Sequence, residues 1–159
     1  MIKTLQISEK EAWDLAFNAL VNNNTSEDNA KEVADALISA EFDGQAGHGL
    51  SRIPSYVEQL TAGKVKGTEA PSIISSKGSV IRVDAKNGFA YPAISLALKE
   101  ITTTCKKFGI AAASITRSHH FGQAGRHVEI LADNGLIGLM FGNTPKAIPP
   151  WGGTKALFG

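Results

Sequence analysis

The sequence has little cysteine, almost no net charge and no long apolar run. Its single cysteine, Cys105, excludes an internal disulfide and a zinc site built from cysteines, and it fits a reducing compartment. The 16 lysines and arginines nearly balance the 15 aspartates and glutamates, so no strong field favours nucleic acid or an anionic membrane. No apolar stretch approaches the roughly 18 residues of a spanning helix, and the first residues lack the apolar segment of a signal peptide. We therefore expect a cytoplasmic protein with neither a nucleic-acid nor a membrane partner.

Residues 1–66 have the pattern of a helical N-terminal portion. Apolar residues recur at helical spacing in three segments, and Ser8 begins a capping box at the start of the first segment. The third helix is predicted to begin near Ser51, because Pro54 then lies in its first turn and removes no intrahelical hydrogen bond. The polar loop 43–49 precedes it.

Residues 67–159 have a different pattern, in which short apolar strands alternate with helices. The spacing predicts strand, helix, strand, helix and strand over residues 80–84, 91–107, 110–116, 122–134 and 136–141. Short connections between such elements favour parallel βαβαβ units with right-handed crossovers. No G-x-G-x-x-G sequence follows a strand, so the classical Rossmann fold is not predicted. The chain stops soon after a stretch rich in proline and glycine, and we expect an incomplete, truncated or split α/β domain.

Two loops follow predicted strands and are candidates for a ligand site. Ligands of open parallel sheets bind beyond the carboxyl ends of the strands, which is where residues 117–122 and 142–145 lie. The first loop also precedes a helix, whose free N–H groups are a natural place for a phosphate or a carboxylate. If the strands pair in parallel, both loops open onto one edge.

Three of the four histidines lie in predicted loops, where catalytic groups are frequent. Histidine changes charge near neutral pH, so His48, His119 and His120 are candidates for proton transfer. Each of them alone is better explained as a surface histidine or a hydrogen-bonded structural one, whereas the three together favour a functional role. His127 lies within a predicted helix, and we expect a partly exposed structural side chain. We expect no metal site, because adjacent histidines rarely chelate one ion and no His-Glu-x-x-His helix is present.

Arg52 has two explanations. A cation in the first turn of a helix opposes the helix dipole unless an anion lies nearby. It is therefore either a solvated surface arginine or a bidentate clamp for a substrate carboxylate. The residues by themselves lead to an α/β domain with a histidine-lined ligand edge.

The same loops resemble motifs of a known family. Residues 47–56 (GHGLSRIPSY) resemble a Ser-His-Gly-x-x-Arg-x-x-x-Tyr segment, and residues 118–122 (SHHFG) resemble Ser-x-His-Phe-Gly. Residues 150–153 (PWGG) and the terminal 157–159 (LFG) resemble Pro-Trp-Gly-Gly followed by the start of a Gly-Thr-Asn-Pro segment. The chain is identified as the N-terminal half of a member of the malate/L-lactate dehydrogenase superfamily, which includes sulfolactate and ureidoglycolate dehydrogenases and cyclic ketimine reductases.

The resemblance implies an activity and a set of site residues. It implies hydride transfer between NAD or NADP and a small 2-hydroxy or 2-oxo acid, on a non-classical cofactor-binding sheet begun by residues 67–159. The proton-transferring residue would be His120 in hydroxy-acid members and His48 in imine-reducing members, and Arg52 would hold the substrate carboxylate. Gly47 stands where many members have serine, which weakens the comparison with imine reductases.

The resemblance also implies a cofactor site and an assembly. The residues that match cofactor contacts are His120, Phe121, Gly122, Gln123, Ala124 and Thr144. A homodimer is expected, and the missing C-terminal half is a possible separate partner chain. The alternative is a non-catalytic protein, either a pseudo-enzyme or a module that dimerises through its apolar helices.

Overall fold

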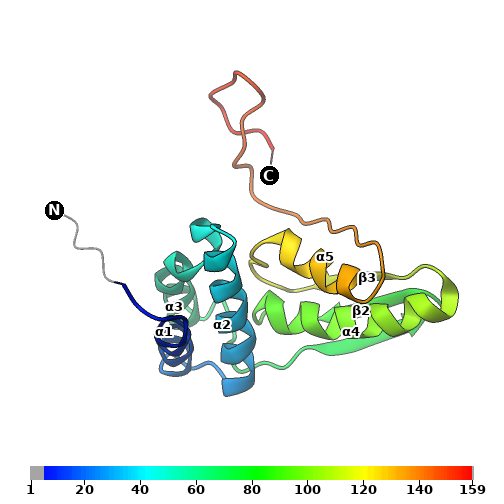
Figure 1. Cartoon of the computed structure of the whole chain (residues 1–159), viewed down its shortest axis with the longest axis horizontal. Coiled ribbons are helices and arrows are strands. Elements are labelled where there is room, and N and C mark those ends of the chain that lie inside the picture. The colour runs from blue at the N-terminus through cyan, green and yellow to red at the C-terminus, as the bar shows by residue number, and fades with distance from the viewer. Residues whose placement is uncertain (1–5, 159) are drawn as a thin grey trace.

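The computed structural model describes residues 6–158, in which helices come first and a small mixed sheet follows (Figure 1). The elements are α1 (Glu9–Val21), α2 (Glu27–Phe42), the 3₁₀ turns η1 (Ala46–His48) and η2 (Leu50–Arg52), α3 (Ile53–Thr61), β1 (Ser72–Lys77), β2 (Val80–Asp84), α4 (Ala90–Phe108), β3 (Ala112–Thr116) and α5 (Ala124–Asp133).

The three predicted N-terminal helices are present. Ser8 caps α1 in a reciprocal capping box with Glu11, which satisfies two N–H groups that the helix leaves without partners. The apolar faces of α1, α2 and α3 enclose one core, in which Leu20, Leu37 and Tyr56 are almost fully buried. The third helix begins as the 3₁₀ turn η2, so Arg52 precedes its first α-helical turn.

The sheet has the order β1-β2-β3 and combines two kinds of pairing. The strands β2 and β3 are parallel and joined by α4, as the sequence predicts, whereas β1 pairs antiparallel to β2 and was not predicted. Helix α4 packs on one face of the sheet, where Ile81 and Val83 meet Ala93 and Ala97. The carboxyl ends of β2 and β3 therefore lie side by side, and the loops that follow them are neighbours.

The prediction of a third parallel strand over residues 136–141 is wrong for the described part of the chain. The segment forms no ladder there, and the N–H and C=O groups of an extended backbone need a partner strand to make one. Its side chains alternate: Leu136 and Met140 pack beside α5, while Ile137, Leu139 and Phe141 are 98%, 81% and 88% exposed. The βαβαβ prediction thus reduces to β2-α4-β3-α5 and an unpaired apolar segment.

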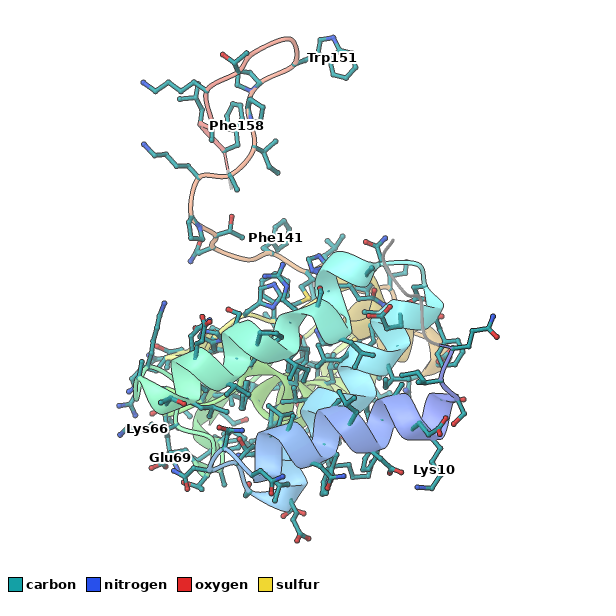
Figure 2. The ribbon with its side chains drawn as sticks, turned by 90° about the vertical axis from the view of Figure 1, so that its left-hand side faces the viewer. Lys10, Lys66, Glu69, Phe141, Trp151 and Phe158 are labelled. Carbon is teal, nitrogen blue, oxygen red and sulfur yellow. The ribbon has the colours of Figure 1, made fainter. Side chains whose placement is uncertain are left out.

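Beyond this segment the chain runs away from the body as an arm (Figures 1 and 2). Figure 2 shows Trp151 and Phe158 well separated from the helices. An antiparallel bridge joins Ile148 to Phe158, so the arm folds back on itself.

The expected division into residues 1–66 and 67–159 stays a prediction, and residues 1–5 and Gly159 lie outside the described residues. Cys105 is half-buried on α4. Between residues 6 and 158, no helix is long and apolar enough to cross a membrane.

Candidate active site

Three residues singled out in the sequence come together in the structure. His48 ends η1, Arg52 ends η2, and His120 lies in the loop after β3. The ring centroids of His48 and His120 are 5.5 Å apart, although 72 positions separate the two residues in the sequence. The helical portion and the β3 loop therefore contribute to one site.

Tyr56 connects this site to the core. Its hydroxyl lies 2.8 Å from Nδ1 of His120 and 3.0 Å from the hydroxyl of Tyr91, and both tyrosines are buried. Because Nδ1 of His120 is occupied by Tyr56, Nε2 is the nitrogen left for a ligand. Tyr91 was not recognised from the sequence, where it appeared only as the start of a helix. The sequence did mark Tyr56, because it is the last residue of the motif at residues 47–56.

His119 points to a different partner. Its Nε2 is hydrogen-bonded to Oε1 of Gln59, and its ring stands edge-on to Tyr56 at 6.1 Å. The two adjacent histidines thus use different contacts on the same face of α3. Among residues 6–158, no group of three histidine, cysteine or carboxylate side chains could hold a metal ion.

Burial and nearby positive charge disfavour the protonated form of each histidine of the site. Burial, followed by the charges of Arg52, His48 and His119, lowers the pKa of His120 to about 4. Burial and Arg52 also lower the pKa of His48, and burial and Lys64 lower that of His119. A carboxylate bound to Arg52 would offset one of these charges and raise the pKa of His120, so an acidic ligand would favour proton uptake there.

Arg52 is half-buried at the entrance of this cluster. Its Nε donates to the carbonyl of Gly47 at 2.5 Å, which ties the guanidinium to the loop that carries His48. Within the described chain, no carboxylate forms an ion pair with Arg52. Its two terminal nitrogens are therefore suited to a carboxylate from outside the chain.

The loop that carries His48 and Arg52 is held by Glu41. The carboxylate of Glu41 accepts a hydrogen bond from the N–H of Leu50 at 2.6 Å. A Cβ atom at Gly49 would lie 2.1 Å from Oε1 of Glu41, so a larger residue there would displace the Glu41 carboxylate from its present position.

The residues expected to contact a cofactor lie at the start of α5, apart from Thr144. Gly122 has a φ of +70°, and a Cβ there would lie 2.7 Å from the Tyr91 hydroxyl. The side chain of Gln123 donates to Asp43 and lines an open cavity of about 380 Å³ with Gly125 and Arg126 among its other walls. No side chain caps the free N–H groups of α5. Thr144 lies on the arm, and its hydroxyl bonds only within its own segment, to Pro145.

The expectation for His127 is wrong. Its side chain is 3% exposed, and its Nε2 is hydrogen-bonded to the carbonyl of Phe121 at 2.8 Å. Apolar periodicity predicts the helix, but it does not report the neighbour that covers His127. His127 supports the loop that carries His120 and is itself not at the ligand edge.

Comparison with known proteins points in one direction. The profile of the family described as malate/L-lactate dehydrogenase matches residues 7–159. The chain is 45% identical over 153 residues to a (2R)-3-sulfolactate dehydrogenase (NADP(+)) of Chromohalobacter salexigens, covering 96% of this chain and 46% of that protein. It is 35% identical to a Delta(1)-pyrroline-2-carboxylate/Delta(1)-piperideine-2-carboxylate reductase of Pseudomonas syringae, covering 98% and 46%.

Solved structures agree with the sequence comparisons. The crystal structure of delta1-piperideine-2-carboxylate reductase from Pseudomonas syringae superposes with a TM-score of 0.78 at 35% identity, over 83% of this chain and 40% of that one. A malate dehydrogenase from Entamoeba histolytica also gives 0.78, at 28% identity, over 84% and 37%. The chain spans about half the length of the curated relatives that it matches.

Proposed function

Because this chain belongs to the malate/L-lactate dehydrogenase family, we propose that it is the acid-binding and proton-transferring part of an NAD- or NADP-dependent oxidoreductase. Its substrates would be small 2-hydroxy or 2-oxo acids. The observation that carries the proposal is the meeting of His48, Arg52 and Tyr56 with His120 at one site.

Arg52 would bind the substrate carboxylate. A guanidinium offers two parallel N–H groups that match the two oxygens of a carboxylate, which fixes the orientation of the acid as well as its position. The loop that carries Arg52 also carries His48, so a bound acid would have its C2 atom near the imidazoles. Binding would also remove part of the positive field that lowers the pKa of His120.

His120 would move the proton. In oxidation, Nε2 would take the proton of the 2-hydroxyl group while a hydride leaves C2; in reduction, the same nitrogen would return that proton to the 2-oxo oxygen. Tyr56 would hold the ring through Nδ1. His48 is the second candidate, because its ring faces that of His120 and cyclic-imine reductases are among the relatives.

The start of α5 fits an anionic cofactor. Its N–H groups have no side-chain cap, and Gly122 brings the backbone close to the site, as the phosphates of a dinucleotide require. When bound, NAD or NADP would accept or supply the hydride. Since this chain spans about half the length of its relatives, the complete cofactor site would include polypeptide that matches their other half.

The test is a set of substituted proteins assayed for turnover. The chain would be assayed alone and together with a polypeptide matching the second half of the similar sulfolactate dehydrogenase, with NADH or NADPH and a panel of 2-oxo acids and cyclic imine carboxylates. We expect His120→Ala to lower the rate by roughly 10²–10⁴-fold, and Arg52→Ala to raise KM by roughly 10–100-fold. Arg82→Ala, which removes an exposed arginine of β2, is the matched control.

Unchanged turnover in both His120→Ala and His48→Ala would remove imidazole from the mechanism. Binding of a 2-oxo acid without any hydride transfer, even with the completing polypeptide, would instead support a non-catalytic binding protein.

A further inference from the structure

The backbone is unusual at the carboxyl ends of β2 and β3. Among the described residues, the non-glycine residues with positive φ are Asn24, Lys86, Asn87 and Arg117. Three of these four lie in the two neighbouring loops after β2 and β3. Asparagine adopts this conformation readily, but lysine and arginine are strained in it, and such strain persists only where the surroundings hold it in place.

Asp84 makes the contacts that hold these loops. It is the last residue of β2 and is buried, and its carboxylate accepts hydrogen bonds from Nε of Arg117 at 2.9 Å and from a terminal nitrogen of the same guanidinium. It also accepts the backbone N–H of Lys86 at 2.8 Å. One carboxylate therefore contacts both strained turns.

Backbone hydrogen bonds join the same two loops. The N–H of Asn87 donates to the carbonyl of Arg117 at 2.7 Å, and the N–H of Ala85 donates to the carbonyl of Thr116 at 3.0 Å. Arg117 is thus fixed through its side chain and its carbonyl. Two and three residues later come His119 and His120, so the conformation of Arg117 determines the direction in which the chain delivers both imidazoles.

We infer that Asp84 and Arg117 are positioning residues, which hold the turn after β3 in its left-handed conformation so that His119 meets Gln59 and His120 meets Tyr56. The catalytic importance of His120 rests on the proposed function. The inference that Asp84 and Arg117 set its position does not depend on that function. The guanidinium of Arg117 is half-exposed, and ion pairs of that kind add little to stability. The pair is therefore explained better by the geometry that it imposes than by the stability that it adds.

The test follows the four histidines by NMR titration in this chain, without cofactor or substrate. Arg117→Ala, Arg117→Gly and Asp84→Asn each remove the pair; glycine also removes the backbone strain. Lys31→Ala, which breaks a comparable ion pair with Asp35 on α2, is the matched control. Circular dichroism reports whether each variant is folded.

We expect the pKa of His120 to rise by one unit or more in all three variants, and that of His119 to rise with it, because burial is the main cause of both depressions. The other groups that face His120, namely Arg52, His48, Tyr56 and the adjacent His119, are unchanged in these proteins. Arg117→Lys keeps the charge but not the two-pronged contact, so it should give a smaller rise.

Comparing the variants of Arg117 and Asp84 distinguishes an effect of the position of His120 from an effect of nearby charge. Loss of a cation raises the pKa of a nearby histidine and loss of an anion lowers it, so a purely Coulombic effect would move Arg117→Ala and Asp84→Asn in opposite directions. Opposite shifts in these two variants would overturn the inference. So would unchanged histidine pKa values in folded variants. It would also be overturned if Arg117→Gly lost its helical circular dichroism signal and shifted the pKa values of all four histidines, because the pair would then support the whole fold. Since no turnover is measured, failure of the proposed enzyme activity would leave this outcome unaffected.

Discussion

The low pKa of His120 predicts that this protein loses stability in mild acid, and that His120→Gln abolishes part of that loss. The folded protein holds His120 with a pKa of about 4, whereas an unfolded chain has the ordinary value of 6.5. Between these two values the unfolded chain binds a proton that the folded chain does not. The stability due to neutral His120 is therefore complete above pH 6.5 and declines as the pH falls toward 4.

The size of this effect follows from the two pKa values. At pH 5 the linkage amounts to about 2 kcal/mol if the full difference applies. Because the ring is only partly buried, solvent screening reduces this figure, and we expect about 1 kcal/mol. His48, His119 and His127 also have lowered pKa values, so the wild-type protein should lose more than this between pH 7.5 and pH 5.

The assay is urea unfolding of the wild-type protein and His120→Gln at both pH values. Glutamine can still bond to Tyr56 but does not titrate, so the pH-dependent loss should be smaller in the variant by about 1 kcal/mol. Thr102→Ala is the control, since it removes a hydrogen bond from the Thr102 hydroxyl to the backbone carbonyl of Leu98, in which neither partner titrates, and should change stability equally at both pH values. If the variant and the wild type lost the same free energy on acidification, His120 would not be held neutral by the fold.

Three further predictions concern packing and backbone geometry. Asn29→Ala should lower the free energy of unfolding by about 2 kcal/mol in urea titrations, because the buried amide donates to two backbone carbonyls that would lose their partner; a change below about 0.5 kcal/mol would contradict this. Gly122→Ala should destabilise more than Gly109→Ala in thermal melts, since both have positive φ but only Gly122 lies against the Tyr91 hydroxyl; equal effects would show that this close approach is unimportant. Ile137→Lys should reduce self-association in light scattering while leaving the melting temperature unchanged, because this apolar side chain is almost fully exposed; a clear loss of stability would refute its exposure.

Much of the fold could be predicted because its signals are local. Capping residues and apolar periodicity gave the helices, and the helix between two short apolar runs gave the parallel β2–β3 pair. The edge strand β1 was missed because its residues Ile73 and Ile74 are adjacent and two serines follow, so no alternation appears. Residues 136–141 show the opposite case, in which the apolar pattern is present but hydrogen-bonding partners also decide whether a strand forms.

The candidate site was predictable only where motifs marked it. His48, Arg52 and His120 stood in recognisable loops, and the structure brings them together. The contact of Tyr91 with Tyr56 joins residues 35 positions apart, and no local pattern reports it. The same holds for the pair of Asp84 and Arg117, which depends on the parallel register of two strands.

Tyr56 belongs both to the N-terminal core and to the candidate site, since its ring packs among the helices and its hydroxyl contacts His120. A ligand that restrains this imidazole should therefore also slow the opening of α1, α2 and α3, detectable as protection from hydrogen exchange far from the point of binding. For the same reason, a substitution at Tyr56 should disturb both the packing of the helices and the contact with His120.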